Sequence, residues 1–264
     1  MMNLTLNWSN FSLDLGQRTH VMGILNVTPD SFSDGGHYLE VNRAVEHALE
    51  MVREGVDIID VGGESTRPFS QKISTNEELD RVCKGEVARE SLKAGASIIN
   101  DISALRSDPQ MAAIAAKAEV PLILMHMKGT PQSMQKNPVY NDVVAEILGF
   151  LEHTIERAKQ AGINENLIIV DPGIGFGKTF DNNLEIIRDL SHFRSLKRPV
   201  LLGSSNKAFI GNILDKEAHE RDTGTMATIA AGVMNGAHIV RVHNVRKAVE
   251  TVKIIDAIKR GRVI

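Results

Sequence analysis

The sequence predicts an α/β fold in which helices cover a parallel β-sheet, and three observations indicate it. After residue 20, short apolar segments alternate with stretches of helical pattern, and repeated strand–helix–strand units favour a parallel sheet with helices outside it. The expected strands are apolar along their whole length, as in sheets that are buried on both faces. No linker rich in Pro, Gly or Ser divides the 264 residues, so we expect residues 1–264 to form a single domain.

The first expected element is a β-hairpin over residues 3–15. Apolar and polar residues alternate from Leu4 to Trp8 and again from Phe11 to Leu15, with a turn expected near Ser9. The parallel strands are expected, in order, at residues 21–26, 57–61, 97–102, 120–127, 167–171, 199–203 and 236–242.

Polar residues follow the carboxyl ends of these expected strands, which is where barrel enzymes carry their active sites. Asn26 ends the first parallel strand, Asp171 ends the fifth, and Arg241 and His243 mark the end of the seventh. The sequence therefore predicts a TIM-type (β/α)8 barrel with an N-terminal hairpin. A closed barrel of this type has eight strands, whereas the sequence offers seven, and residues 76–94 show a helical pattern with no strand.

Composition excludes several classes of function. The formal net charge of −3 and the pI near 6.3 give no electrostatic reason to expect nucleic acid or an anionic membrane surface as a partner. No apolar run of about eighteen residues is present, so no membrane span is expected. The single cysteine, Cys83, cannot form an internal disulfide, and the N-terminal residues do not resemble a secretory signal, so we expect a cytoplasmic protein.

Two early strand ends carry groups that suit ligands, and each has a plain structural alternative. Asn26 and the hydroxyls and carboxylates of the following loop, residues 28–34, offer hard oxygen atoms that suit Mg²⁺ and its phosphate ligands. The alternative is an ordinary turn-rich loop. Residues Gly62–Pro68 place Arg67, which suits a carboxylate or phosphate, after a strand; the alternative is a turn with a surface salt bridge.

The segment Asp171–Lys178 is rich in glycine but lacks the spacing of a Walker A phosphate loop. Its strand-end Asp171 can accept two N–H groups of a heterocycle, and the glycines let a flat ligand approach the backbone. The alternative is that Asp171 serves as a helix N-cap.

Lys207, Arg241 and His243 lie at the ends of neighbouring expected strands, where their charges suit an anionic leaving group such as pyrophosphate. Arg241 and His243 share one strand face because side chains alternate with period two. The alternative for the histidine is core packing or a cap. His126 has no second histidine at metal-ligand spacing, and we interpret it as structural or pocket-lining.

In combination these segments resemble the dihydropteroate synthase family, the folate-pathway enzymes that sulfonamides inhibit. The matching pieces are Met22–Gly36, Ile58–Pro68, Ile98–Ile102, Leu124–Met127, Asp171–Lys178, Gly203–Gly211 and Ile239–His243. The resemblance implies that p-aminobenzoate is joined to 7,8-dihydropterin-6-ylmethyl pyrophosphate and that pyrophosphate is released. It also implies a homodimer formed through the later helices, and sulfonamides as competitors of p-aminobenzoate.

The resemblance assigns roles to individual residues of this chain. Asn26 would bind Mg²⁺ and the pyrophosphate. The leaving group would be surrounded by Arg67, Lys207, Arg241 and His243, which we expect to be catalytic. The residues that bind the pterin would be Asn100, Asp171, Ile102, Met125 and Phe176, together with Lys207. The residues around p-aminobenzoate and the strand end beside it would be Thr66, Pro68, Gly203 and Ser205, together with Arg67.

The chain departs from the family pattern in two places. About 20 residues are missing near positions 82–86, including the third barrel strand, its pterin-binding Asp and most of the preceding helix. The neighbouring strands could then pair directly in a seven-stranded barrel, or the barrel could open there. Alternatively, the written sequence could omit residues that the protein itself contains. In addition, Asn206 stands where the family has an Arg.

Two other functions remain open from the sequence. A degenerate, non-catalytic family member would bind pterin weakly or act structurally, and the missing Asp favours it. A methyltetrahydrofolate–corrinoid methyltransferase shares the pterin-binding barrel, but it would have no use for an anion site at Lys207, Arg241 and His243.

Overall fold

The computed structural model describes residues 4–27, 37–62, 84–130, 134 and 137–261, and for residues 37–40 and 84 it describes the backbone alone. Within these ranges, no helix combines the length and the apolar character that crossing a membrane requires.

The predicted hairpin is confirmed. Strands β1 (Thr5–Trp8) and β2 (Phe11–Asp14) pair antiparallel, and Ser9 adopts a φ of 46° in the turn between them. Leu6, Trp8 and Leu15 are buried in the main hydrophobic core. The alternating apolar residues of the hairpin therefore pack onto the sheet, as their period of two predicts.

Seven parallel strands follow in the described part of the chain, and each coincides with an expected strand. They are β3 (His20–Asn26), β4 (Ile58–Gly62), β5 (Ile99–Asp101), β6 (Leu122–Met125), β7 (Ile168–Asp171), β8 (Leu201–Leu202) and β9 (Ile239–Val242). All ladders among them are parallel.

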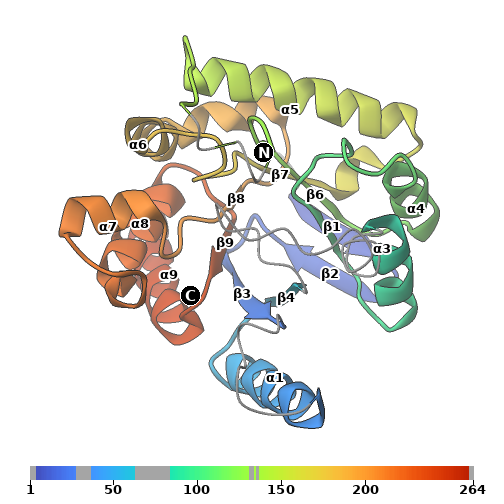
Figure 1. Ribbon diagram of the computed structural model, residues 1–264, viewed down its shortest axis with the longest axis horizontal. Helices are drawn as coiled ribbons and strands as arrows, with labels where there is room; N and C mark the ends of the chain where they lie inside the picture. Colours follow the sequence, from blue (N-terminus) through green and yellow to red (C-terminus); the bar gives the residue numbers. More distant parts are fainter. Residues whose placement is uncertain (1–3, 28–36, 63–83, 131–133, 135–136, 262–264) are drawn as a thin grey trace.

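Helices lie outside these strands, as Figure 1 shows. They are α1 (His37–Arg53), α3 (Lys84–Lys93), α4 (Met111–Ala118), α5 (Val143–Gln160), α6 (Phe180–Arg188), α7 (Ala208–Leu214), α8 (Asp222–Met234) and α9 (Val245–Arg260), with 3₁₀ turns η2 (Glu165–Leu167), η3 (Leu190–Leu196) and η4 (Ala218–Glu220). Side chains cap several of them: Thr179 and Asn182 form a reciprocal capping box at α6, and Asn244 caps α9. The helix expected over 76–94 is confirmed for α3, and residues 76–83 lie outside the described residues.

Backbone hydrogen bonds place the strands in the orders β4-β3-β9-β8 and β5-β6-β7. An isolated bridge between Val170 and Val200 brings β7 beside β8, and the Val170 N–H donates to the Pro199 carbonyl at 2.9 Å. The strands thus follow one another from β4 around to β5. Among the described residues no ladder joins β4 to β5, so the predicted closed barrel is not seen, and the described part of the sheet has an open side here.

Burial of the strands reflects the open side. Leu122, Ile123 and Leu124 of β6 are 0% exposed, and β7 and β8 are buried throughout. In β4, by contrast, no residue is fully buried, and Val61 is 62% exposed. The expectation of strands buried on both faces is therefore wrong for β4, because no described strand lies beside its outer edge.

Asp256 of α9 fastens the C-terminal helix to the start of β3. Its Oδ2 accepts the Thr19 N–H at 2.7 Å, and its Oδ1 accepts the Thr19 hydroxyl at 2.8 Å.

Asp256→Ala would leave both buried donors without this acceptor, so we expect the free energy of unfolding to fall by about 1–3 kcal/mol in urea denaturation. Glu250→Ala, at an exposed position of the same helix, should change it by less than about 0.5 kcal/mol. Equal losses in the two variants would contradict this role for Asp256.

Candidate active site

A cavity of about 1650 Å³ reaches the carboxyl ends of the strands. It is lined by nine of the predicted site residues, namely Asn26, Asn100, Ile102, Phe176, Gly203, Ser205, Lys207, Arg241 and His243. The cavity also reaches Trp8 and Leu13 of the hairpin. A cavity at the carboxyl ends of the strands is where barrel enzymes bind their ligands.

Two predicted residues lie beside the cavity rather than on its surface, and three lie outside the described residues. Met125 packs with Ile102 and Phe176 in a small apolar cluster, and Asp171 is buried at the end of β7. Thr66, Arg67 and Pro68 fall in a part of the chain that the structure does not describe.

Asp60 of β4 holds two of the predicted residues in place. The Arg241 Nε donates to Asp60 Oδ2 at 2.7 Å, and an NH2 nitrogen of Arg241 lies 2.5 Å from the same oxygen. The Asn100 Nδ2 donates to this oxygen at 3.3 Å, across the open side of the sheet. The carboxylate therefore neutralises Arg241 and fixes the directions of both side chains.

The sequence reasoning missed Asp60, although a signal was present. Asp60 is the one charged residue in an otherwise apolar strand, Ile58–Gly62. A partly buried carboxylate in an apolar strand favours a hydrogen-bonding or charged partner. Such a residue could have been assigned to the site before the structure was known, but its partners could not.

Lys207 lies against the aromatic wall of the cavity. Its ammonium nitrogen is 4.2 Å from the centre of the Phe176 ring, a cation–π contact. Gly175 has a φ of 82°, and a Cβ there would lie 2.9 Å from Lys207 Cδ, so glycine permits this approach. Burial lowers the pKa of Lys207 to about 8, and the nearby Arg241 guanidinium acts in the same direction. Lys207 is therefore a cation at neutral pH whose charge calls for an anionic partner.

Asp171 is the buried carboxylate of the site. Burial raises its pKa, and this is opposed by the Gly173 N–H, which donates to Oδ1 at 2.7 Å, and by the charge of Lys207. The alternative role of Asp171 as a helix N-cap is wrong, since Thr179 caps α6. A carboxylate in this position can accept N–H groups from a flat ligand in the cavity.

Ser205 and His243 form a pair at the ends of β8 and β9. The Ser205 hydroxyl lies 2.9 Å from His243 Nδ1 and accepts the His243 backbone N–H at 3.2 Å. Ser205 is buried, whereas His243 is exposed toward the cavity. The serine thereby orients the imidazole that was predicted to face an anion.

Asn26 ends β3 beside Gly62 of β4. A Cβ at Gly62 would lie 3.9 Å from Asn26 Oδ1, so this amide oxygen has space next to a glycine. Among the described residues, no group of three or more His, Cys, Asp or Glu side chains could hold a metal ion. Water and substrate oxygens are the usual further ligands of Mg²⁺ in proteins.

The structure gives a physical reason for Asn206. Its φ of 56° lies in the left-handed region, which asparagine tolerates better than most residues. Its backbone N–H donates to Thr225 Oγ1 at 3.1 Å, and its carbonyl accepts Arg221 NH1 at 3.0 Å. Asn206 therefore serves the local turn, and a guanidinium from a different position, Arg221, lies against it and lines the cavity.

Comparison with known proteins gives a consistent result. The family model for pterin binding enzymes matches residues 22–85 and 83–243. The dihydropteroate synthase of Bacillus subtilis is 44% identical over 265 aligned positions, which cover 93% of this chain and 90% of the relative. A Yersinia pestis dihydropteroate synthase structure with a sulfonamide drug complex has a TM-score of 0.89 and 40% identity, covering 97% of this chain and 99% of that chain. A Xanthomonas albilineans dihydropteroate synthase structure with 4-aminobenzoic acid has a TM-score of 0.85 and 39% identity, covering 94% and 95%.

The Asp60–Arg241 pair leads to a prediction about anion affinity. Asp60→Asn keeps the shape of the side chain and an acceptor oxygen but removes the negative charge beside Arg241. We expect inorganic pyrophosphate to bind about two- to tenfold more tightly at low salt, because charges several ångströms apart at a partly buried site interact with energies of about 1 kcal/mol or more. Isothermal titration calorimetry at two salt concentrations measures the effect.

Lys207→Gln serves as the matched control for this experiment, since it removes a positive charge from the same cavity and should weaken pyrophosphate binding. Weaker or unchanged binding in Asp60→Asn would show that Asp60 does not limit the charge of the site.

Proposed function

The chain belongs to the pterin-binding enzyme family and, within it, to the dihydropteroate synthases, and we propose that its strand-end residues carry out that reaction in the cavity. In the reaction, the bond between the pterin methylene carbon and pyrophosphate breaks. The amine nitrogen of p-aminobenzoate forms the new bond to that carbon and loses a proton. The observation that carries the proposal is the convergence of Lys207, Arg241 and His243 with the buried carboxylate of Asp171.

The cations would stabilise the leaving group. Pyrophosphate gains negative charge as the carbon–oxygen bond breaks, and fixed positive groups in a partly dry cavity stabilise that charge more strongly than water does. Arg241 is oriented by Asp60, and His243 by Ser205. Arg67, outside the described residues, is proposed to join them on the basis of the family pattern.

Mg²⁺ is proposed as the metal, held by Asn26. A single amide oxygen together with pyrophosphate oxygens and water would satisfy its octahedral preference, which dedicated protein cages rarely do. When bound, the ion would supply charge neutralisation at the phosphate oxygens. Asn26 would orient it at the end of β3, on the cavity side of Gly62.

The pterin is proposed to lie between the buried carboxylate and the apolar cluster. Asp171 would accept N–H groups of the heterocycle, with Asn100 and Lys207 as further hydrogen-bonding groups. Met125, Ile102 and Phe176 already pack together and offer apolar surface for a flat ring. Gly175 and its neighbours keep the backbone close without a side chain in the way.

p-Aminobenzoate is proposed to bind near Ser205 and Gly203, together with Thr66, Arg67 and Pro68. The Xanthomonas structure with 4-aminobenzoic acid and the Yersinia structure with a sulfonamide complex support this substrate and its competitors for the present chain. The Arg67 guanidinium would match the substrate carboxylate through paired hydrogen bonds.

We also propose that the third barrel strand of the family and part of the preceding helix are absent from this chain. The family model matches in two pieces that meet at residues 83–85. The Bacillus alignment has 265 positions, whereas 93% of 264 residues is about 246, so about 19 positions have no residue here. The open side between β4 and β5 lies at the same place in the sheet. An intact mass near 28.9 kDa for the protein purified from its natural source would support the proposal, and a larger mass would contradict it.

A homodimer is proposed as the assembled form. Helices α7, α8 and α9 carry large apolar side chains that are exposed in the single chain, namely Ile213, Leu214, Met234, Ile254 and Ile258. Exposed apolar residues gathered on neighbouring helices favour an interface.

The proposed function predicts turnover with a weakened pterin site. Purified protein should release pyrophosphate only when the pterin pyrophosphate, p-aminobenzoate and Mg²⁺ are all present. Its affinity for the pterin should be at least tenfold lower than that of a family member that keeps the third-strand Asp. A hydrogen bond to a charged group contributes about 1.5–3 kcal/mol, which corresponds to this factor or more. A coupled pyrophosphate assay and calorimetry measure the two quantities.

The outcomes distinguish the alternatives. Pterin binding without turnover would identify a non-catalytic family member. Methyl transfer to a cobalamin protein, without turnover of p-aminobenzoate, would identify a corrinoid methyltransferase. Turnover with ordinary pterin affinity would contradict the role given to the missing Asp.

A further inference from the structure

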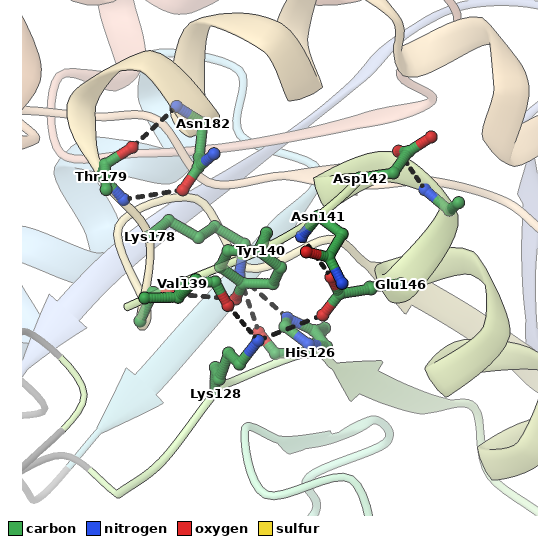
Figure 2. A network of polar contacts seen from close by, with 12 residues as sticks. His126, Lys128, Val139, Tyr140, Asn141, Asp142, Glu146, Lys178, Thr179 and Asn182 are labelled. Atoms are coloured by element: carbon green, nitrogen blue, oxygen red, sulfur yellow. Dashed lines mark hydrogen bonds and ion pairs between the residues drawn. The ribbon is translucent and has the colours of Figure 1, made fainter. Parts of the chain in front are cut away.

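Lys178, a lysine to which the proposed reaction assigns no role, is almost completely buried. It lies in the loop between β7 and α6, directly before the N-cap Thr179, and is 2% exposed. Its ammonium nitrogen lies 2.9 Å from His126 Nδ1 and 3.5 Å from the His126 carbonyl oxygen (Figure 2). The same nitrogen lies 3.0 Å from the Phe176 carbonyl oxygen. A buried lysine is costly to keep unless its three N–H groups are well used, so this arrangement calls for a role.

His126 is held as the neutral partner of this lysine. Burial lowers the pKa of His126 to about 2, and the Lys178 charge acts in the same direction. The neutral imidazole accepts the ammonium N–H at Nδ1, which places its own proton on Nε2. The ring also packs edge-on against Phe150, with 4.9 Å between ring centres, so its orientation is fixed.

The two segments that Lys178 joins are in direct backbone contact. A Cβ at Gly173 would lie 1.9 Å from the His126 carbonyl oxygen, and a Cβ at Gly177 would lie 2.3 Å from the Lys128 carbonyl oxygen. The Tyr140 hydroxyl, which Figure 2 shows beside them, donates to the Gly177 carbonyl at 2.7 Å. The loop after β7 therefore lies on the end of β6 and is fastened there by hydrogen bonds.

These segments carry the proposed pterin wall. Met125 directly precedes His126, and Phe176, whose carbonyl accepts from Lys178, presents its ring to Lys207. Asp171 begins the same loop, and the charge of Lys178 favours its ionised form, together with Lys207 and Arg241. Lys178 thus contacts the backbone carbonyls of His126 and Phe176, and part of its own side chain lines the cavity.

We propose that Lys178, acting through His126, is a positioning residue that fixes the pterin wall by joining the end of β6 to the loop after β7. The proposal rests on the proposed function for the identity of the ligand. Its electrostatic part agrees with the surroundings: burial lowers the pKa of Lys178 to about 7, while Asp171 acts to raise it and Lys207 and Lys128 act to lower it. Below neutral pH the ammonium supplies three donors to its three acceptors.

Lys178→Met tests the proposal, because methionine keeps the length of the side chain and removes every donor. Affinity for 6-hydroxymethyl-7,8-dihydropterin, which lacks the pyrophosphate, should fall at least tenfold in calorimetry. Affinity for inorganic pyrophosphate should change less than threefold, because Lys178 donates to His126 and Phe176, whereas Arg241 is oriented by Asp60 and His243 by Ser205. Lys159→Met, at an exposed ion pair on α5, is the matched control and should change neither affinity.

A second variant keeps the test decisive if Lys178→Met fails to fold. His126→Phe removes the Nδ1 acceptor and retains an aromatic ring, so it should weaken pterin binding selectively by a smaller factor, about threefold or more. Equal losses of pterin and pyrophosphate affinity, or unchanged pterin affinity in a folded variant, would overturn the positioning role. Wild-type protein that binds pterin but releases no pyrophosphate would contradict the proposed function alone.

Discussion

The site depends on charged groups that are partly or fully buried and that offset one another. Desolvating a single charge costs several kcal/mol, so a buried carboxylate or ammonium persists only with compensating partners. Here the positive charges of Lys178, Lys207 and Arg241 favour the ionised form of Asp171. Asp60 in turn neutralises Arg241. The net charge of these groups is positive, and an anionic substrate in this cavity would balance it. Burial, with a smaller contribution from the charge of Arg241, lowers the pKa of Lys207 to about 8.

The open side of the sheet affects the two halves of the site unequally. Lys207 and Arg241 come from the ends of β8 and β9, which form an intact ladder with β3. Met125 and Asp171 end β6 and β7, which are also paired, whereas Ile102 of the apolar cluster follows β5. Asn100 and Asp60 lie on β5 and β4, which have no described strand at their outer edges, and one hydrogen bond of 3.3 Å connects them. Among the described residues, the proposed anion-binding groups therefore follow strands that have neighbours on both sides, whereas Asn100, a proposed pterin-binding residue, lies on a strand that is paired on one side.

Strand positions and strand-end residues could be predicted from the sequence because continuous apolar runs have few alternatives to a buried parallel strand. The predicted residues that line the cavity could be identified because parallel strands bring their carboxyl ends to one edge of the sheet. Asp60 and Lys178 could not be placed, since their partners, Arg241 and His126, are 181 and 52 residues away in the chain. The proposed absence of the third strand rests on the resemblance and not on periodicity, because the helical pattern over residues 76–94 carries no sign of a strand.

The guanidinium of Arg241 explains how one residue can serve both Asp60 and an anionic leaving group. Arginine presents five N–H donors in a planar fork, and the contacts with Asp60 engage Nε and NH2 along one edge. NH1 is not part of those contacts and points along the other edge of the fork. A lysine could not hold the carboxylate and the anion on two separate edges, because its positive charge is a single point. Asp60 can therefore keep Arg241 oriented while the proposed leaving group departs, so the contact with Asp60 and the proposed contact with pyrophosphate need not compete.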